Sequence, residues 1–233
     1  MSARKKCTSL PQTPSVVGTI HSPGALRRAL KLRGGQVDFL ELRVDHFDRD
    51  PESLLAAIPR LAAPLIVTVR HPAEGGEPAL SPARRRELYG RFMPAAAFID
   101  VELRSCGTHR DVIESARAAG VGVIVSDHHF RSTPSLRALR ARLQRLRGVD
   151  FDLFKLAARA VKPADLATLL AFLAGAKRPL SVMGMGPYGK VSRLLLARAG
   201  SLFNYGYLDQ PQVPGQWEAT TLKERIGELL SEH

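Results

Sequence analysis

One lysine of this sequence stands where a lysine is costly to place. Lys155 lies between Phe154 and Leu156, inside an apolar segment fit for burial. A buried lysine loses hydration, and this favours the neutral amine that attacks a carbonyl carbon to form an imine. The alternative is a structural lysine whose ammonium group reaches solvent along its own aliphatic stem. Residue type and context together indicate Schiff-base chemistry at Lys155.

A pair of histidines ends the apolar segment that precedes the lysine. His128 and His129 are adjacent, so on a strand their side chains point to opposite sides and at most one of them faces the same space as Lys155. Imine chemistry needs a group that removes and returns protons near neutral pH, and histidine is the usual one. One histidine of the pair is therefore the expected acid/base partner of the lysine.

Further charged and hydroxyl side chains stand at the ends of other apolar segments. Taken one at a time, each could be an ordinary ion pair or a solvated loop residue. Several of them acting on one substrate require a fold that brings the ends of many segments together. The segments are Glu41-Leu42-Arg43-Val44-Asp45, Thr68-Val69-Arg70, Asp100-Val101-Glu102 and Ser126-Asp127-His128.

Eight short apolar runs alternate with eight helical patterns along the chain. The runs are nearly continuous in apolar residues, which is typical of parallel strands covered on both faces. The expected strands are 15–20, 37–43, 65–70, 97–103, 121–126, 151–157, 180–185 and 201–207. The expected helices are 24–32, 52–61, 83–92, 109–119, 135–146, 164–174, 190–199 and 219–230. This order predicts an α/β fold, a (β/α)₈ TIM barrel, whose active site lies at the C-terminal ends of the strands.

An open doubly wound sheet is the alternative fold. Such a sheet normally carries a glycine-rich phosphate loop after its first strand, and Gly18 followed by Ser22-Pro23-Gly24 does not form one. The helix starts are marked by a capping residue followed by proline, whose missing N–H would be unpaired there. These pairs are Ser22-Pro23, Asp50-Pro51, Ser81-Pro82, Thr133-Pro134 and, less clearly, Lys162-Pro163.

Length and composition favour a single catalytic domain. The 233 residues, 45% of them hydrophobic, suffice for one barrel over residues 15–233, preceded by a flexible basic tail over residues 1–14. We expect a cytoplasmic protein, because no run of about twenty apolar residues and no secretory signal can be recognised. Cys7 and Cys106 lie far apart and outside any metal-ligand spacing, so neither a disulfide framework nor a metal site is expected.

The chain is strongly basic, with a net charge of +12. This charge suits either an anionic small molecule or a nucleic acid. Aromatic residues make up only 6% of the chain and do not interleave with the arginine runs, as a stacking platform for single strands would require. A nucleic-acid partner is therefore the lesser alternative, and no membrane association is expected.

Taken in order, the motifs of the sequence resemble those of the type I 3-dehydroquinate dehydratases over nearly the full length. Each motif is weak alone, and their order on successive barrel elements makes the resemblance specific. The matching segments are Glu41-Leu42-Arg43-Val44-Asp45, Arg70 with Glu74-Gly75-Gly76, Ser126-Asp127-His128, Phe154-Lys155-Leu156-Ala157, Met185-Gly186 through Ser192-Arg193, Gly200-Ser201 and Val213-Pro214-Gly215-Gln216.

The resemblance implies a hydro-lyase that needs no cofactor and converts 3-dehydroquinate to 3-dehydroshikimate and water. This reaction belongs to the shikimate pathway towards chorismate and the aromatic amino acids, and it also serves quinate breakdown. Lys155 would form an imine at C3 of the substrate, and His128 would take the proton from C2 and return it to the leaving C1 hydroxyl. Glu74 would orient His128. Family members are often dimers, so a homodimer is the assembly that the resemblance suggests.

Six further residues would bind the substrate. Arg193 would pair with its carboxylate through two nitrogens, which a planar guanidinium does better than an ammonium group. Glu41, Arg43 and Arg70 would hold the ring hydroxyls, and Gln216 would close over the substrate from the last loop. Gln212, two residues before Pro214, takes a place where many members carry serine or alanine, and it is expected in the same site.

The residues leave a few alternatives open. His129 is a rival for the acid/base role, Glu41 and Arg43 could form a plain ion pair, and Glu102 is expected to be a supporting charge rather than a catalyst. A Schiff-base aldolase would share Lys155 and could use the glycines of 183–186 for a phosphate, although Arg193 and the last loop favour a carboxylate. A non-catalytic barrel that binds nucleic acid is the alternative from another class.

Overall fold

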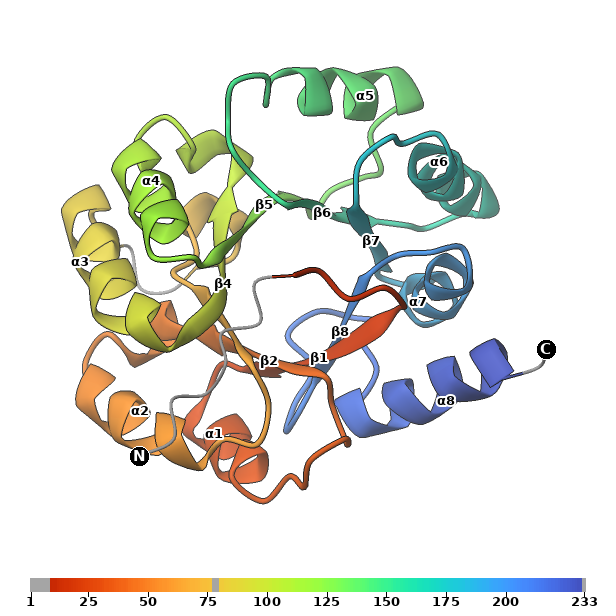
Figure 1. Cartoon of the computed structure of the whole chain (residues 1–233). Coiled ribbons are helices and arrows are strands. Elements are labelled where there is room, and N and C mark those ends of the chain that lie inside the picture. Colours follow the sequence, from red (N-terminus) through yellow and green to blue (C-terminus); the bar gives the residue numbers. More distant parts are fainter. Residues whose placement is uncertain (1–8, 77–79, 232–233) are drawn as a thin grey trace.

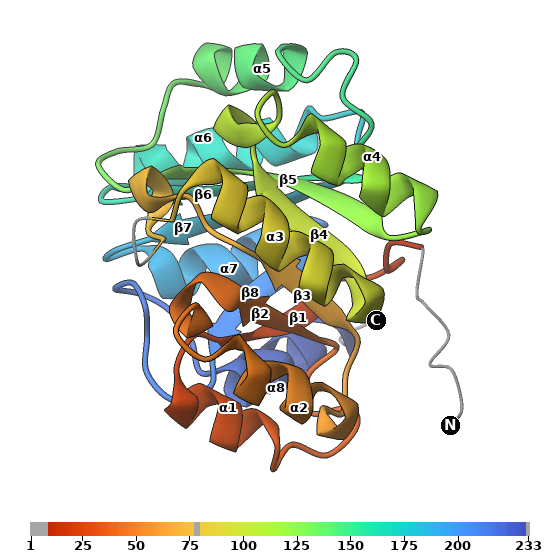
Figure 2. The same cartoon turned by 90° about the vertical axis from the view of Figure 1, so that its left-hand side faces the viewer.

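The computed structural model describes residues 9–76 and 80–231, and over these residues the predicted barrel is confirmed. The eight strands of the parallel sheet are surrounded by helices (Figures 1 and 2). The strands are β1 (Ser15–Ile20), β2 (Phe39–Arg43), β3 (Leu65–Thr68), β4 (Ala96–Glu102), β5 (Gly122–His129), β6 (Leu153–Arg159), β7 (Leu180–Met185) and β8 (Phe203–Tyr207). Residues 1–8 of the expected N-terminal tail lie outside the described residues, and Leu10 already packs against the barrel interior.

Each strand is followed by one α-helix, as the alternating pattern predicted. The helices are α1 (Pro23–Ala29), α2 (Pro51–Ala57), α3 (Pro82–Phe92), α4 (Arg110–Ala118), α5 (Leu136–Gln144), α6 (Pro163–Ala174), α7 (Gly189–Arg198) and α8 (Ala219–Ser231). The side chains of Ser22, Asp50 and Ser81 cap α1, α2 and α3 as expected, each accepting a hydrogen bond from a backbone N–H of the first turn.

The expected start of α5 at Thr133-Pro134 was wrong. Ser135 caps this helix, and its hydroxyl accepts from Ala138 N at 3.3 Å. Thr133 does not cap the helix, because its hydroxyl donates to the carbonyl of Arg159 at the end of β6. A threonine before a proline has the form of a cap, but here it joins a loop to a neighbouring strand.

The barrel interior is apolar at the N-terminal ends of the strands. Phe39, Phe98 and Phe203 meet edge to face there, with ring centroids 4.9 to 6.0 Å apart. Gly122 on β5 is required beside them, since a Cβ at this position would lie 2.3 Å from the ring of Phe98. Because successive inward side chains are two residues apart, each strand passes from this apolar floor to a polar layer above it.

The ring of strands closes differently between β7 and β8. The other neighbours form parallel ladders in the order β7-β6-β5-β4-β3-β2-β1-β8. At this seam two serine hydroxyls substitute for ladder bonds: Ser201 Oγ accepts from Val182 N at 2.9 Å, and Ser181 Oγ accepts from Phe203 N at 2.8 Å. The strands that carry the last part of the site are thereby held together.

Candidate active site

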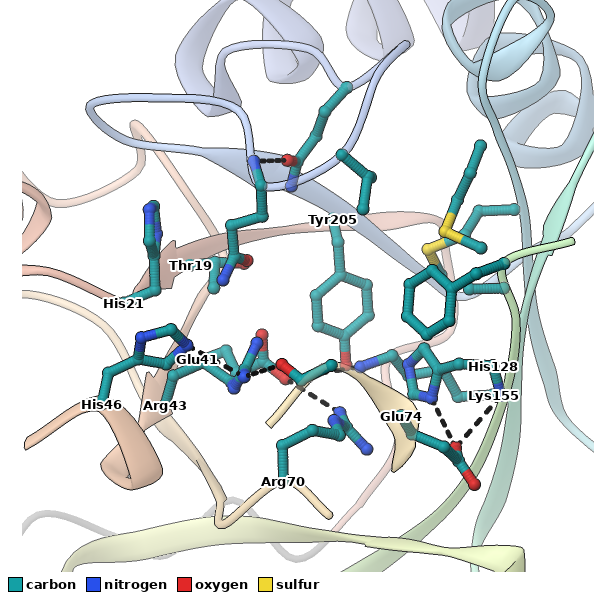
Figure 3. Close-up of a pocket in the computed structure, with 18 of the residues that line it drawn as sticks. Thr19, His21, Glu41, Arg43, His46, Arg70, Glu74, His128, Lys155 and Tyr205 are labelled. Carbon is teal, nitrogen blue, oxygen red and sulfur yellow. Dashed lines mark hydrogen bonds and ion pairs between the residues drawn. The ribbon is translucent and has the colours of Figure 1, made fainter. Parts of the chain in front are cut away.

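A pocket of about 380 Å³ opens at the C-terminal ends of the strands, and it gathers all nine residues predicted for the site. Figure 3 shows most of these side chains converging from different strands. The nine are Glu41, Arg43, Arg70, Glu74, His128, Lys155, Arg193, Gln212 and Gln216. The structure therefore brings together residues that lie up to 175 positions apart in the sequence, from 41 to 216.

Lys155 lies on β6 at the base of the pocket and is only 4% exposed. Its Nζ donates to Asp100 Oδ2 at 2.9 Å and to Glu41 Oε1 at 3.3 Å. The face of the Tyr205 ring covers the same nitrogen, with the ring centroid 3.8 Å away. The amine is thus buried and held in one direction. This excludes the alternative of a structural lysine whose ammonium group reaches solvent.

The carboxylates beside the lysine belong to a buried network of alternating charges. Arg70 donates to both oxygens of Asp100, at 3.0 and 3.1 Å, and also contacts Glu102 at 3.3 Å. Glu102 pairs in turn with Arg85 at 2.6 Å. Burial alone would raise the pKa of Asp100, but Arg70 and Lys155 outweigh it and hold that pKa well below its ordinary range. Glu102 also accepts from the backbone N–H of His71 at 2.8 Å, and it is not among the residues that line the pocket.

His128 and Glu74 form a hydrogen-bonded pair on the wall of the pocket. His128 Nδ1 lies 2.9 Å from Glu74 Oε2, and the same oxygen accepts from the backbone N–H of His128 at 3.2 Å. The imidazole stacks on Phe130, at an interplanar angle of 14°. Glu74 is presented by a short 3₁₀ turn (Pro72–Glu74) that ends at Gly75 in the left-handed region, with φ at 82°.

His128 and Glu74 are both uncharged over much of the neutral range. Burial raises the pKa of Glu74 to about 8. Burial, together with the charges of Arg70 and Lys155, lowers the pKa of His128 well below its ordinary value. The contact has the geometry of an ion pair, yet both shifts favour the uncharged forms, so the proton lies on or near the carboxyl. Nε2 of His128 is the ring nitrogen for which the described residues supply no partner.

His129 is turned away from the pocket that Lys155 lines. Its Nε2 lies 3.0 Å from Asp127 Oδ2, and Arg142 contacts the same carboxylate at 2.9 Å. These groups line a separate depression behind Glu74. Of the two histidines, His128 is thus the one that lines the pocket together with Lys155.

Arg43 is paired with Asp45 instead of with Glu41. Arg43 Nε and Nη2 donate to the two Asp45 oxygens at 3.0 and 2.8 Å, and Nη2 also donates to the carbonyl of Gly75 at 2.8 Å. Arg43 therefore fastens the turn that carries Glu74. Glu41 accepts from Thr68 Oγ1 at 2.9 Å and from Lys155.

Arg193, on α7, is a buried cation bound by backbone carbonyls. Nε donates to Tyr205 O at 3.0 Å, and Nη1 donates to Gly184 O, Gly189 O and Gly215 O at 2.7 to 3.0 Å. Burial lowers the pKa of Arg193 to about 10. Only Nη2 lacks an acceptor among the described residues, so the two-nitrogen pairing expected with a carboxylate is not available while these bonds persist. An anion in the pocket would meet Nη2 alone.

The last loop closes the pocket on the side of α7. Gln216 Oε1 accepts from Gln212 N at 2.9 Å, and Gly186 N donates to Pro214 O at 2.8 Å. Gly215 has φ at 78°, and a Cβ there would lie 2.1 Å from Gly186 O, so only glycine fits. The described residues contain no cluster of three metal-ligating side chains.

Several residues of the site were not predicted. Asp100 was noted as a polar strand residue without a role, although it contacts Lys155. Tyr205 was placed on a strand, and its inward direction follows from the two-residue period. The pocket is also lined by Thr19, His21, His46, Phe130 and Met183, for which the sequence offered no separate signal, and by Met185, which was noted only as part of a motif.

Known proteins resemble the chain over most of its length. Residues 19–229 match the type I 3-dehydroquinase family. A 3-dehydroquinate dehydratase from Klebsiella pneumoniae is 36% identical over 213 residues, 83% of each chain, and one from Thermococcus gammatolerans is 32% identical over 91% of this chain and 97% of its own. The crystal structure of a Clostridium difficile type I 3-dehydroquinate dehydratase with covalently modified comenic acid superposes with a TM-score of 0.83. It is 26% identical and covers 94% of this chain and 93% of its own.

Proposed function

The chain belongs to the type I 3-dehydroquinase family, and from this premise we propose that Lys155 and His128 carry its chemistry. It is a 3-dehydroquinate dehydratase, a hydro-lyase of the shikimate pathway. This assignment decides between the dehydratase and the two alternatives, the aldolase and the nucleic-acid-binding barrel. The observation that carries the roles of the residues is the buried amine of Lys155 in the same pocket as the His128–Glu74 pair.

Imine formation is the first step that the geometry supports. In its ammonium form the lysine must give up a proton before it attacks, and Glu41, which accepts a hydrogen bond from Nζ, can take that proton transiently. The freed lone pair forms a C–N bond to C3, and the ketone oxygen leaves as water. Both hydrogens of that water come from the ammonium group, so the iminium ion retains one positive charge and one N–H.

The elimination then uses the imidazole twice. Nε2 of His128 accepts the proton from C2, and the C–H electrons flow into the iminium nitrogen to give an enamine. When these electrons return, the C1–O bond breaks and His128 gives its proton to the departing hydroxyl, which leaves as water. Hydrolysis of the remaining iminium ion releases 3-dehydroshikimate and restores Lys155.

Charge attracts and orients the substrate. The unpaired Nη2 of Arg193 is the donor placed to meet its carboxylate, while Glu41, Arg43 and Arg70 offer charged groups to its hydroxyls. The net charge of +12 favours the approach of an anion to the protein as a whole. Gln212 and Gln216 face the pocket from the last loop and would contact the bound ring.

The test joins an activity assay to chemical trapping. Purified protein with 3-dehydroquinate should produce the ultraviolet band of the conjugated product, and borohydride should fix an adduct on Lys155. Lys155→Ala should abolish both signals, whereas the exposed control Lys162→Ala should preserve them. His128→Ala should still yield the adduct but lose about 10²–10⁴-fold in turnover.

Two results would contradict these roles. Turnover near the parent rate in Lys155→Ala would remove the imine mechanism. A variant His129→Ala that is crippled while His128→Ala remains active would transfer the acid/base role to the other histidine.

A further inference from the structure

Two buried tyrosines of this barrel differ in how their hydroxyl groups are satisfied. Tyr89, on α3, donates to the backbone oxygen of Asp100 at 2.6 Å. Tyr205, on β8, is 4% exposed, and its hydroxyl finds no hydrogen-bond partner within residues 9–76 and 80–231. A buried donor without an acceptor is unfavourable, so such a group calls for an explanation.

The unpartnered hydroxyl belongs to the ring that covers the reactive amine. Figure 3 shows Tyr205 reaching from β8 towards Lys155 and Glu41. The ring centroid lies 3.8 Å from Nζ, and Nζ in turn donates to Asp100 at 2.9 Å and to Glu41 at 3.3 Å. Burial, and then the negative charges of Glu41 and Asp100, raise the pKa of Tyr205 well above its ordinary value, so the phenol keeps its proton and remains a donor.

Imine formation changes the number of donors around these two carboxylates. The ammonium group of Lys155 has three N–H bonds, and two of them are directed at Asp100 and Glu41. The iminium nitrogen has one N–H bond, and its other positions belong to carbon. At least one of the two buried carboxylates therefore loses its hydrogen bond from the lysine when the substrate becomes attached. Asp100 keeps its donors Arg70 and Ser126 and Glu41 keeps Thr68, but the loss of one donor to a buried carboxylate is unfavourable.

We propose that Tyr205 is a positioning residue whose hydroxyl replaces Lys155 as hydrogen-bond donor to the Glu41–Asp100 carboxylates while the lysine is tied up as an imine. This inference rests on the proposed function of Lys155. The phenol acts through the carboxylates and does not touch the substrate. Its ring contributes separately, because the face that attracts the ammonium cation attracts the iminium cation as well.

Stability measurements on six proteins test the donor exchange without any substrate: the parent and Lys155→Met, each alone, with Tyr205→Phe and with Tyr89→Phe. In the parent, Tyr205→Phe removes a hydroxyl that has no partner, so the melting temperature should stay the same or rise. In Lys155→Met the carboxylates have permanently lost the hydrogen bonds from Lys155, and there Tyr205→Phe should lower the melting temperature by a few degrees. Tyr89→Phe, which removes a hydroxyl with a partner, should lower it in both backgrounds. Equal effects of Tyr205→Phe in the two backgrounds would overturn the proposal.

Trapping then connects the exchange to catalysis. At saturating 3-dehydroshikimate, the ratio of imine to free enzyme captured by borohydride should be about tenfold lower in Tyr205→Phe than in the parent. Binding of the same ligand to Lys155→Met should be unaffected by Tyr205→Phe, because no imine forms in that protein. A weaker affinity there would mean that the hydroxyl contacts the ligand directly, and it would refute the proposed role. Absence of any adduct in the parent would refute the function of Lys155 itself, while the stability measurements would still decide on the donor exchange.

Discussion

Asp100→Asn should strongly destabilise the fold, because this carboxylate is fully buried and accepts four hydrogen bonds. The donors are Arg70 Nη1 and Nη2 at 3.0 and 3.1 Å, Ser126 Oγ at 2.5 Å and Lys155 Nζ at 2.9 Å. Asparagine keeps one oxygen, so the bonds to Arg70 Nη2 and Lys155 are lost and an amide N–H₂ faces two cations. Hydrogen bonds to charged groups contribute about 1.5–3 kcal/mol each, and breaking a buried ion pair costs about 3–5 kcal/mol. We therefore expect the free energy of unfolding to fall by about 3–5 kcal/mol.

Urea unfolding of the parent and of Asp100→Asn at pH 7 measures this loss. Asp111→Asn is the matched control, since Asp111 pairs with Arg86 on the surface and should cost less than about 1 kcal/mol. Because the folded-state pKa of Asp100 is depressed, its stabilisation is present above the ordinary carboxyl pKa and is lost as the pH falls. The gap between parent and variant should therefore narrow below about pH 4. A loss under about 1 kcal/mol at an unchanged denaturant slope, or a gap independent of pH, would refute the reasoning.

Two other expectations concern the pocket wall. The pKa of Glu74 is raised to about 8, so below that pH the carboxyl keeps its proton and donates it in a hydrogen bond to Nδ1 of His128. The imidazole's own proton then lies on Nε2, which cannot accept a proton from the substrate. The pH profile of kcat/KM should therefore rise towards about pH 8, and Glu74→Gln should lose this ionisation. An unchanged profile in Glu74→Gln would mean that the protonation of Glu74 does not control the base. Arg193→Lys should raise KM by roughly tenfold with a smaller effect on kcat, because one ammonium group cannot satisfy four carbonyls and also meet an anion. Steady-state kinetics decide this, and an unchanged KM would place the carboxylate elsewhere.

The parts of the molecule that the sequence predicted well are those set by local periodicity. Continuous apolar strands and capped helices repeat eight times, and this pattern has few other solutions than a barrel. The same two-residue period places Lys155 and Glu41 inside it. Thr133-Pro134 misled the prediction because a capping residue is recognised by its neighbours in sequence, whereas the hydroxyl of Thr133 donates to Arg159 on another strand.

Contacts between distant strands were harder to predict than element positions. The role of Asp100 depends on Arg70 from the end of β3 and Lys155 from β6, and nothing near Asp100 in sequence announces either partner. Arg193 was expected to offer two nitrogens to a ligand, but four backbone carbonyls, from β7, α7, β8 and the last loop, occupy two of its three nitrogens. Every residue has a backbone carbonyl, so the sequence does not indicate which carbonyls will accept hydrogen bonds from a given side chain in the folded protein.

The alternating charges beneath the pocket also constrain how this protein can evolve. Glu41, Asp100 and Glu102 supply three negative charges, and Arg70, Arg85 and Lys155 supply three positive ones, all almost fully buried. A single change at any of the six leaves an odd charge in the interior, where it is strongly unfavourable. Drift at these positions must therefore pass through compensating pairs, in which one buried carboxylate and one buried cation change together.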